Sequence, residues 1–361
     1  MTLPVVEIDG EPFEQGRQHG MALRGQIAHN LSVYYDRFER EAQLPIDEVR
    51  RRASQYVPVL QRSADYFEVI RGIAETSRQE LLDVVMLNIR YELLYYQYSI
   101  IPVGGPDGCT SFAVLPGASS NGHLLLGENW DWIPSVAGAV VHTRYEGGSF
   151  ETLAFTEAGI VGGKIGLNSL GLGLAINGLL STEDDWAHLE KPFHVRCYEI
   201  LRSTSFDDAV RLVSATPRSC SANFVVAQAP DRAVDVEAAP GTSCSFGPAR
   251  GLLAHTNHFL EPEHLGVEEP PFAERRPHSL TRLARMRSVL DARQPLSVAD
   301  VQACLRDHDN FPDSVCRHVH PDDPPEEACP TVVSAVMDLT ERTLWLAEGP
   351  PCEHAYACYA L

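Results

Sequence analysis

Cys109 is placed where its thiol could react with the peptide bond that precedes it. It follows Gly108, at the end of the turn-rich stretch Val103-Gly-Gly-Pro-Asp-Gly108, and begins the strand-like run Cys109-Thr-Ser-Phe-Ala-Val-Leu115. Because Gly108 has no side chain, the thiol can approach the preceding carbonyl and form a thioester by an N-to-S acyl shift. Hydrolysis would then free an α-amine at Cys109. The reference pKa of such an amine, roughly 7.7–8.0, lies near the roughly 8.5 of a thiol, so it could serve as the base for its own side chain.

The motifs that follow decide the interpretation, because a Gly-Cys pair alone more often marks an inert buried thiol. In chain order they are Asn129-Trp-Asp-Trp132, Gly166-Leu-Asn-Ser-Leu-Gly171 with Asn177-Gly178, His255-Thr-Asn-His258 and Val315-Cys-Arg-His318. With Asp107-Gly-Cys-Thr-Ser-Phe at their head, they resemble the acyl-coenzyme A:6-aminopenicillanate (isopenicillin N) acyltransferase family of self-processing N-terminal nucleophile hydrolases. The resemblance extends to the segment Leu344–Cys352, and its most specific parts are Asp-Gly-Cys-Thr and Asn-Trp-Asp.

This resemblance implies an α+β fold, a four-layer αββα sandwich preceded by a helical N-terminal segment. Autocleavage would divide the chain into residues 1–108, a helical α-subunit, and residues 109–361, the catalytic αββα core or β-subunit. The cleaved segment would then stay with the core as its heterodimer partner.

The resemblance also implies a role for each matching residue. Cys109 matches the nucleophile, Gly108 the residue that gives up its carbonyl, and Asp131 the carboxylate that anchors the new α-amine. Asn257 matches the side-chain amide of the oxyanion hole, where a neutral donor avoids burying a charge. Arg317 matches an arginine that pairs with site acids, and the strand ending at Asn177 matches a backbone donor. Simpler roles remain open: a turn cap for Asp131 and a structural salt bridge for Arg317.

Hydrophobic spacing indicates which elements position these residues. Apolar side chains three and four apart predict helices over 12–40 and 46–98. Beyond Cys109 the pattern favours strands, and Asn121-Gly122 between two of them is a hairpin signal. The expected strands are 109–115, 123–132, 138–146, 151–156, 164–168, 172–177, 223–228, 233–238, 252–256, 331–338, 342–347 and 355–360, with helices at 192–203, 206–214, 278–291 and 297–306. This order indicates layered α+β rather than βαβ repeats.

No cofactor or metal is expected from the motifs. Gly159-Ile-Val-Gly-Gly-Lys164 lacks phosphate-loop spacing, and Gly166–Gly171 is too long for a serine nucleophile elbow. His318 and His320 with Asp322 and Asp323 could bind a metal, but loop histidines beside acids are usually solvated. The nine cysteines are odd in number and lack a Cys-x-x-Cys pair, which argues against a disulfide framework and favours small buried thiols in a reducing cytoplasm.

The formal net charge of −20 excludes several partners. Phosphate backbones and anionic membrane surfaces both require a basic face, so we expect neither nucleic acid nor membrane as a partner. The chain shows no signal-peptide pattern and no apolar window of about 18 residues. We therefore predict a cytoplasmic enzyme whose partners are a small-molecule amide or acyl donor and its own cleaved segment.

The favoured activity is cleavage of a linear amide, such as an N-acyl amine or an acyl-amino-acid amide, through an acyl-thioester on Cys109. Water would complete a hydrolysis and a second amine an acyl transfer. Two alternatives keep the chain uncleaved. One is a papain-like hydrolase in which a histidine such as His258 activates Cys109. The other is a non-catalytic binding protein that uses the tyrosine-rich stretch 91–98 as a pocket, although such a stripe is more often helix core.

Overall fold

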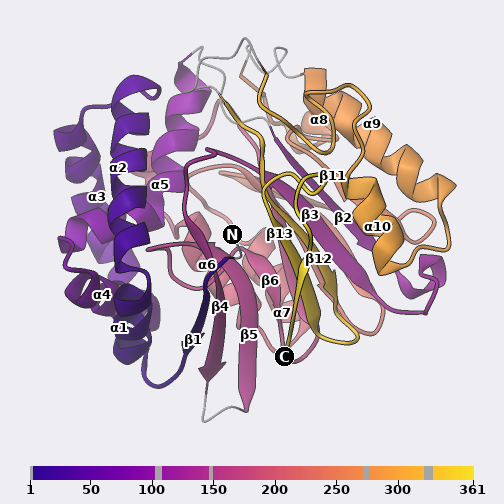
Figure 1. Cartoon of the computed structure of the whole chain (residues 1–361). Helices are drawn as coiled ribbons and strands as arrows, with labels where there is room; N and C mark the ends of the chain where they lie inside the picture. The colour runs from indigo at the N-terminus through magenta and orange to yellow at the C-terminus, as the bar shows by residue number, and fades with distance from the viewer. Residues whose placement is uncertain (1–2, 102–107, 146–148, 271–276, 321–327) are drawn as a thin grey trace.

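Two β-sheets pack face to face in the computed structural model of this chain, which describes residues 3–101, 108–145, 149–270, 277–320 and 328–361 (Figure 1). The eight-stranded sheet has the order β1-β4-β5-β6-β7-β8-β9-β10 and the six-stranded sheet the order β11-β2-β3-β12-β13-β14. The strands are β1 (Val5–Ile8), β2 (Cys109–Val114), β3 (Leu125–Asp131), β4 (Gly138–Tyr145), β5 (Phe150–Glu157), β6 (Ile165–Asn168), β7 (Leu172–Gly178), β8 (Ala222–Gln228), β9 (Arg232–Ala239), β10 (Thr242–Phe246), β11 (Leu252–His255), β12 (Thr331–Asp338), β13 (Thr343–Glu348) and β14 (Ala357–Ala360).

Helices cover the outer face of each sheet. α6 (Phe193–Leu201) and α7 (Phe206–Ser214) lie on the eight-stranded sheet, whereas α9 (Pro277–Ala292) and α10 (Val298–Leu305) lie on the six-stranded one. The predicted four-layer αββα sandwich is thereby confirmed. In the inner layers both faces of a strand are covered, so β2, β3 and β7 are buried at every residue and do not alternate between polar and apolar.

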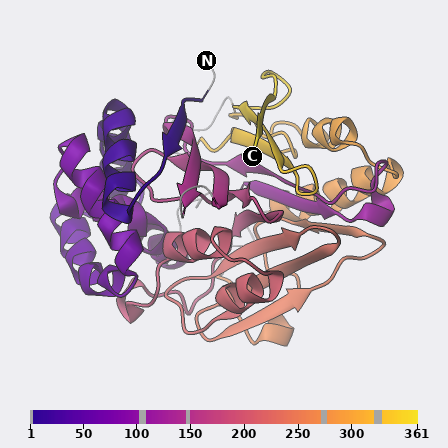
Figure 2. The same cartoon turned by 90° about the horizontal axis from the view of Figure 1, so that it is seen from below.

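The N-terminal helices form a block at one side of the sheets (Figure 2). They are α1 (Pro12–Ala22), α2 (Arg24–Arg40), α3 (Ile46–Gln61), α4 (Ala64–Ser77) and α5 (Leu81–Ile100). The helical character predicted for 12–40 and 46–98 is confirmed, and each range is divided into shorter helices. Arg78, with a φ of 61°, ends α4 in the left-handed conformation, which an unbroken helix cannot contain.

Buried amides of this block bind the loops of the sandwich. The Asn30 side chain donates to the carbonyls of Ala137 and Ala158 at 2.9 and 3.0 Å and accepts from the Ala137 N–H. Asn88 donates to the carbonyl of Gly159 and accepts from the Val161 N–H. Such bonds satisfy loop groups that burial would otherwise leave without water.

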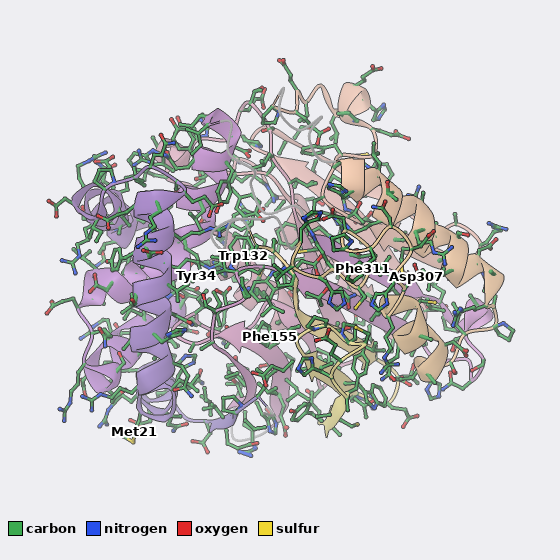
Figure 3. The ribbon with its side chains drawn as sticks, turned by 45° about the horizontal axis from the view of Figure 1, so that its top comes forward. Met21, Tyr34, Trp132, Phe155, Asp307 and Phe311 are labelled. Carbon is green, nitrogen blue, oxygen red and sulfur yellow. The ribbon has the colours of Figure 1, made fainter. Side chains whose placement is uncertain are left out.

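A buried ion cluster lies deeper in the same contact. Glu157, at the end of β5, accepts from Arg90 of α5, from Lys164 and from the hydroxyl of Tyr34 of α2. Burial alone would raise the pKa of Glu157, but the two cations outweigh it and lower that pKa to about 2. Tyr34 in turn accepts from Trp132 Nε1 at 2.7 Å, and Figure 3 shows these two side chains together. The cluster therefore joins the segment 1–108 to the strands by charge as well as by packing.

The tyrosine-rich stripe of α5 belongs to the core. Tyr91, Tyr95 and Tyr98 are buried, Tyr91 stacks on Phe193, and its hydroxyl donates to the carbonyl of Ser221. The prediction of helix core is confirmed for these three residues. The nine cysteines all lie in the described residues, where none forms a disulfide and six are buried. Among the helices in the described ranges, none has the length and apolar character needed to cross a bilayer.

Candidate active site

Cys109 begins β2, which lies between the edge strand β11 and β3 in the six-stranded sheet, and is 4% exposed. β2 pairs antiparallel with β3, as the hairpin signal predicts, and this register places Cys109 opposite Trp130, one residue before Asp131. The thiol Sγ lies 4.0 Å from the main-chain oxygen of Asp131. Burial first, and then the nearby carboxyls of Glu128 and Asp131, raise the pKa of the Cys109 thiol well above its usual range. The thiol is therefore neutral in the uncut chain and needs a base in order to react.

Gly108 sits against the side chains of Asp131 and Arg317. A Cβ built on residue 108 would stand 2.5 Å from the Cβ of Asp131 and 3.0 Å from both Asp131 Oδ2 and Arg317 Nη1. Two carbon atoms cannot approach so closely, so any side chain on residue 108 would displace Asp131 or Arg317. The predicted scissile residue, anchor carboxylate and site arginine thus meet around one backbone unit.

Thr331 connects Asp131 with Arg317. Its hydroxyl donates to Asp131 Oδ1 at 2.7 Å and accepts from the backbone N–H of Arg317 at 3.0 Å. Arg317 Nη2 also forms an ion pair with Asp313 Oδ1 at 3.0 Å. Arg317 therefore has both a structural partner in its own loop and a place beside Gly108.

The side chain of Asn257 faces the backbone of Cys109. Asn257 Oδ1 accepts from the Cys109 N–H at 2.6 Å, and its Nδ2 donates to the Gly178 carbonyl at 3.1 Å. An amide nitrogen has two hydrogens, and this bond uses one of them. Ser279 holds the Asn257 loop, since its Oγ accepts from the Asn257 N–H at 2.8 Å. The predicted oxyanion residue is thus adjacent to the nucleophile, with its oxygen on the Cys109 amide.

Arg282 was missed by sequence reasoning. It extends from α9, is 1% exposed, and donates to the Cys109 carbonyl at 2.6 Å and to Asn257 Oδ1 at 3.1 Å. A lone arginine on an amphipathic helix is ordinarily expected on the solvent face. The available signal was its position on the buried stripe with Ser279, Met286 and Leu290, at spacings of three and four.

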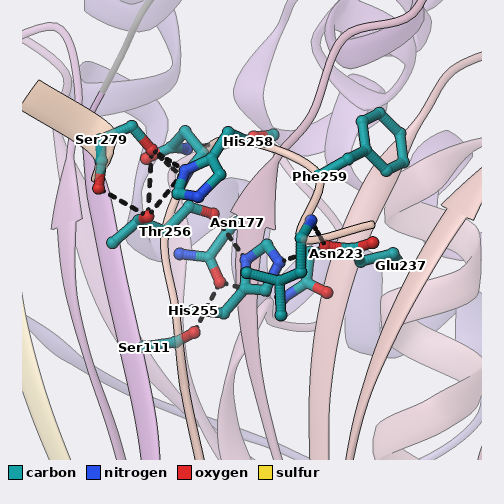
Figure 4. Close-up of polar contacts among 12 residues, drawn as sticks. Ser111, Asn177, Asn223, Glu237, His255, Thr256, His258, Phe259 and Ser279 are labelled. Atoms are coloured by element: carbon teal, nitrogen blue, oxygen red, sulfur yellow. Dashed lines mark hydrogen bonds and ion pairs between the residues drawn. The ribbon is translucent and has the colours of Figure 1, made fainter. Parts of the chain in front are cut away.

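Asn177 lies one layer away from Cys109. Its Oδ1 accepts from Ser111 Oγ at 2.5 Å and from Asn223 Nδ2 at 3.2 Å, so its side chain bridges the two sheets (Figure 4). The structure does not bring this side chain to the thiol. What reaches the site from the end of β7 is the backbone, through the Gly178 carbonyl that binds Asn257.

The histidines beside Asn257 have other partners. His258 Nδ1 lies 2.7 Å from Ser279 Oγ, and His255 Nε2 lies 2.8 Å from the buried Glu237 (Figure 4). Burial alone would lower the pKa of His255, but Asp235 and Glu237 outweigh it and raise that pKa. Within the described part of the chain, no histidine is hydrogen-bonded to Cys109 Sγ, so the geometry gives the papain-like alternative no support.

Asn129 and Trp130, the first two residues of the Asn-Trp-Asp motif, have structural contacts. Its Nδ2 donates to the carbonyls of Leu305 and Val315 at 2.9 and 2.8 Å, which fastens the segment before Arg317 to β3. Trp130 packs its ring under the Lys164 ammonium, 3.4 Å from the ring centroid. Burial lowers the pKa of Lys164 to about 8. The motif therefore fixes both the arginine loop and the buried ion cluster.

Comparison with known sequences covers most of the chain. The model of the acyl-coenzyme A:6-aminopenicillanic acid acyl-transferase family matches residues 118–353, a range that contains Asp131, Asn177, Asn257 and Arg317. The 40 kDa form of acyl-coenzyme A:6-aminopenicillanic-acid-acyltransferase from Emericella nidulans is 28% identical over 327 residues, which cover 86% of this chain and 84% of that protein. An uncharacterized protein of Archaeoglobus fulgidus is 22% identical over 48% of this chain and 32% of its own length.

Two solved structures show weaker likenesses. An N-acylethanolamine-hydrolyzing acid amidase ortholog of Caenorhabditis elegans has a TM-score of 0.47 at 14% identity, covering 64% of this chain and 93% of that one. Penicillin V acylase from Agrobacterium tumefaciens has a TM-score of 0.42 at 15% identity, covering 66% and 83%. At these scores neither likeness bears on the site.

Proposed function

Since this chain belongs to the acyl-coenzyme A:6-aminopenicillanic acid acyl-transferase family, we propose that it is a self-processing cysteine amidohydrolase or acyltransferase. In this proposal the chain cuts itself between Gly108 and Cys109 and then uses Cys109 as its nucleophile. The family match makes it an enzyme of the acyltransferase and amidase type. The cut, the residue roles and the substrate class are the proposal.

Processing begins with attack of Cys109 Sγ on the Gly108 carbonyl carbon. The C–S bond forms, the C–N bond breaks, and the thiol proton ends on the departing nitrogen. Water then hydrolyses the thioester and releases the carboxylate of Gly108. This step is supported by the bond from the Cys109 N–H to Asn257 Oδ1, which holds the leaving nitrogen, and by the bond from Arg282 to the Cys109 carbonyl.

The mature site would then contain a free α-amine on Cys109. Such an amine lies on the same residue as the thiol and can accept its proton, so no histidine is required. Asp131, beside the Gly108 position, would hold the amine through charge, while Asn257 stabilises the oxyanion. The resemblance adds a backbone N–H near the end of β7 as a second donor. The protonated amine would then give its proton to the departing group of the substrate.

The proposed substrate is a linear amide, such as an N-acyl amine or an acyl-amino-acid amide. Cys109 would take the acyl group as a thioester and release the amine. Water completes a hydrolysis, and a second amine bound in place of water completes an acyl transfer. The β-lactam compound in the family's name is not among the substrates proposed for this chain.

The observation that carries the proposal is the contact of Gly108 with Asp131 and Arg317 directly before a buried cysteine. Its test is the intact mass of freshly purified wild-type protein beside Cys109→Ala under denaturing conditions. Division of the 39.8 kDa chain at residue 108 gives fragments of about 12 and 28 kDa. We expect both fragments in the wild type and one intact chain in the variant.

Two other outcomes would replace the proposal. An intact wild-type chain that hydrolyses amides and loses activity in His258→Ala would indicate the papain-like alternative. An intact chain that is neither active nor labelled at Cys109 by a thiol-reactive substrate analogue would indicate a binding protein.

A further inference from the structure

Four side chains outside the candidate active site converge on one point. They are His308, Cys316, His318 and Cys352, and one potential ligand atom from each lies within 4.8 Å of all the others. Three of them come from the loop after α10, and Cys352 comes from the turn after β13. Two sulfurs and two imidazole nitrogens form the donor set of a Cys₂His₂ zinc site.

Four of the six ligand-to-ligand separations match those of a tetrahedron around a single ion. The two sulfurs of Cys316 and Cys352 are 3.5 Å apart. His318 Nε2 lies 3.6 Å from Cys316 Sγ, 3.3 Å from Cys352 Sγ and 3.3 Å from His308 Nε2. Zinc bonds of about 2.3 Å to sulfur and about 2.0–2.1 Å to nitrogen give tetrahedral edges of about 3.3–3.8 Å. The four distances agree with these edges.

The surroundings of His318 also favour ligation. Its second ring nitrogen, Nδ1, lies 3.5 Å from Glu353 Oε1. A carboxylate at this distance favours a proton on Nδ1 and leaves the Nε2 lone pair directed at the cluster. Carboxylates that orient a ligating histidine in this way are a regular feature of zinc sites.

We propose that His308, Cys316, His318 and Cys352 bind one structural Zn²⁺. The protein supplies all four ligands, so no position is left for water or substrate, which separates this site from catalytic zinc. The two thiolates balance the charge of the ion. A tetrahedral set with two sulfurs also selects against Mg²⁺ and Ca²⁺, which require oxygen ligands.

The metal would tie a loop without regular structure to the C-terminal turn. In the described residues 306–320 neither helix nor strand forms, and backbone bonds such as Cys316 N–H to the Asp307 carbonyl hold the loop locally. Figure 3 shows Asp307 and Phe311 of this loop next to α9 and α10. Arg317 stands between the ligands Cys316 and His318, so the same ion would fix its backbone near Asp131.

The spacing of these ligands explains why the sequence did not reveal them. There is no Cys-x-x-Cys pair, and the fourth ligand is separated from the others by β12 and β13. Of the group considered from sequence, only His318 belongs to the cluster. His320 is not part of it, and Asp322 and Asp323 lie outside the described residues.

The test is the metal content of the full-length protein, purified without added metal or chelator. Inductively coupled plasma mass spectrometry measures this content. We expect one zinc per chain. Cys352→Ser and His308→Ala should lower this to less than about a tenth of the wild-type value under competition with a chelator. Glu353→Gln should weaken zinc affinity by about tenfold. Cys358→Ser, which changes another exposed cysteine outside the cluster, is the matched control and should keep its metal.

Replacement of zinc by Co²⁺ gives an independent readout. Tetrahedral cobalt with two thiolates should produce strong visible d–d bands and a thiolate charge-transfer band, which Cys352→Ser should alter and Cys358→Ser should not. A wild-type protein that binds neither zinc nor cobalt overturns the proposal, as does a disulfide between Cys316 and Cys352 found by peptide mapping. The Cys109→Ala chain should bind zinc normally, which keeps this result separate from the outcome for self-processing.

Discussion

Gly108 lies so close to Asp131 that a Cβ on residue 108 would stand 2.5 Å from the Cβ of Asp131. The Gly108–Cys109 peptide bond, which is proposed to break, therefore follows a glycine, the residue type that fits against Asp131 without displacing it. This contact makes the role of Gly108 testable by adding a single methyl group.

Gly108→Ala should fold with a stability loss of about 1–3 kcal/mol, because the neighbouring side chains must shift. The added methyl group should also move the carbonyl of residue 108 away from Cys109 Sγ, which should slow processing by about 10²-fold. A time course of fragment formation on denaturing gels measures this rate. Gly117→Ala is the control, because a Cβ there meets no atom within 4 Å. Equal rates for Gly108→Ala and wild type would contradict the steric role given to Gly108.

Asp131→Asn keeps the shape of the side chain but removes its charge. If Asp131 anchors the α-amine of Cys109, amide turnover in the mature protein should fall by about 10²-fold, mainly in kcat. Steady-state kinetics on an N-acyl amine would show this split. Asp338→Asn, at the other end of the β3–β12 pair, is a buried control that should retain activity. Full activity in Asp131→Asn would favour the papain-like alternative instead.

Asn257→Asp separates the two functions of that side chain. The variant keeps an oxygen to accept from the Cys109 N–H but lacks the amide donor. If Asn257 stabilises the oxyanion, kcat of Asn257→Asp should fall by about 10²–10³-fold. The kcat of Asn257→Ala should fall by at least the same factor. Normal kcat in Asn257→Asp, with loss only in Asn257→Ala, would mean that the residue acts solely as an acceptor for Cys109.

Glu157→Gln should be among the most destabilising single changes in the molecule. It leaves the buried cations Arg90 and Lys164 without their carboxylate, at a cost of about 3–5 kcal/mol. Urea unfolding in the uncut Cys109→Ala chain measures the free energy. The control is Glu199→Gln, which breaks the more exposed pair with Lys191 and should cost about 1 kcal/mol or less. Similar values for the two variants would mean that the cluster contributes little.

His19 should make the protein sensitive to acid. Burial lowers its pKa from 6.5 to about 4 in the folded state, where Nε2 accepts from the Gly159 N–H. The unfolded chain therefore takes up the proton first, and stability should fall as pH drops from about 6.5 to about 4, by roughly 3 kcal/mol. Chemical unfolding at several pH values measures this slope. His19→Gln should flatten it, whereas the exposed control His29→Gln should not.

The strands after Cys109 could be predicted because β-prone runs separated by Gly, Asn and Ser signals persist even where both faces are buried. Two strands could not. β10, Thr-Ser-Cys-Ser-Phe, has no apolar alternation and forms because it pairs with β9, and the four residues of β1 form a strand because they pair with β4. Both pairings are tertiary contacts that a local pattern does not contain.

The same limit applied to the site. Cys109, Asp131, Asn257 and Arg317 could be proposed from short motifs, and the structure brings all four near Gly108 and β2. Arg282 was missed although it lies on the buried stripe of its helix, because its partners are far away along the chain. The cluster of His308, Cys316, His318 and Cys352 could not be predicted because its fourth member is separated from the others by two strands. The resemblance placed a backbone donor in the strand that ends at Asn177, and this role stays a prediction. The structure shows that the Asn177 side chain bridges the sheets and that the Gly178 carbonyl reaches Asn257.

The strand β1 gives the proposed cut a kinetic consequence. Val5–Ile8 pairs in parallel with Val140–Thr143 of β4, so residues 1–108 supply an edge of the larger sheet as well as its helical block. Before a cut at Gly108 the chain folds as one molecule, and its rate does not depend on concentration. Afterwards the same contacts join two polypeptides, so refolding becomes a second-order encounter that slows with dilution. Processing would thus make unfolding much harder to reverse without removing a single contact from the folded protein.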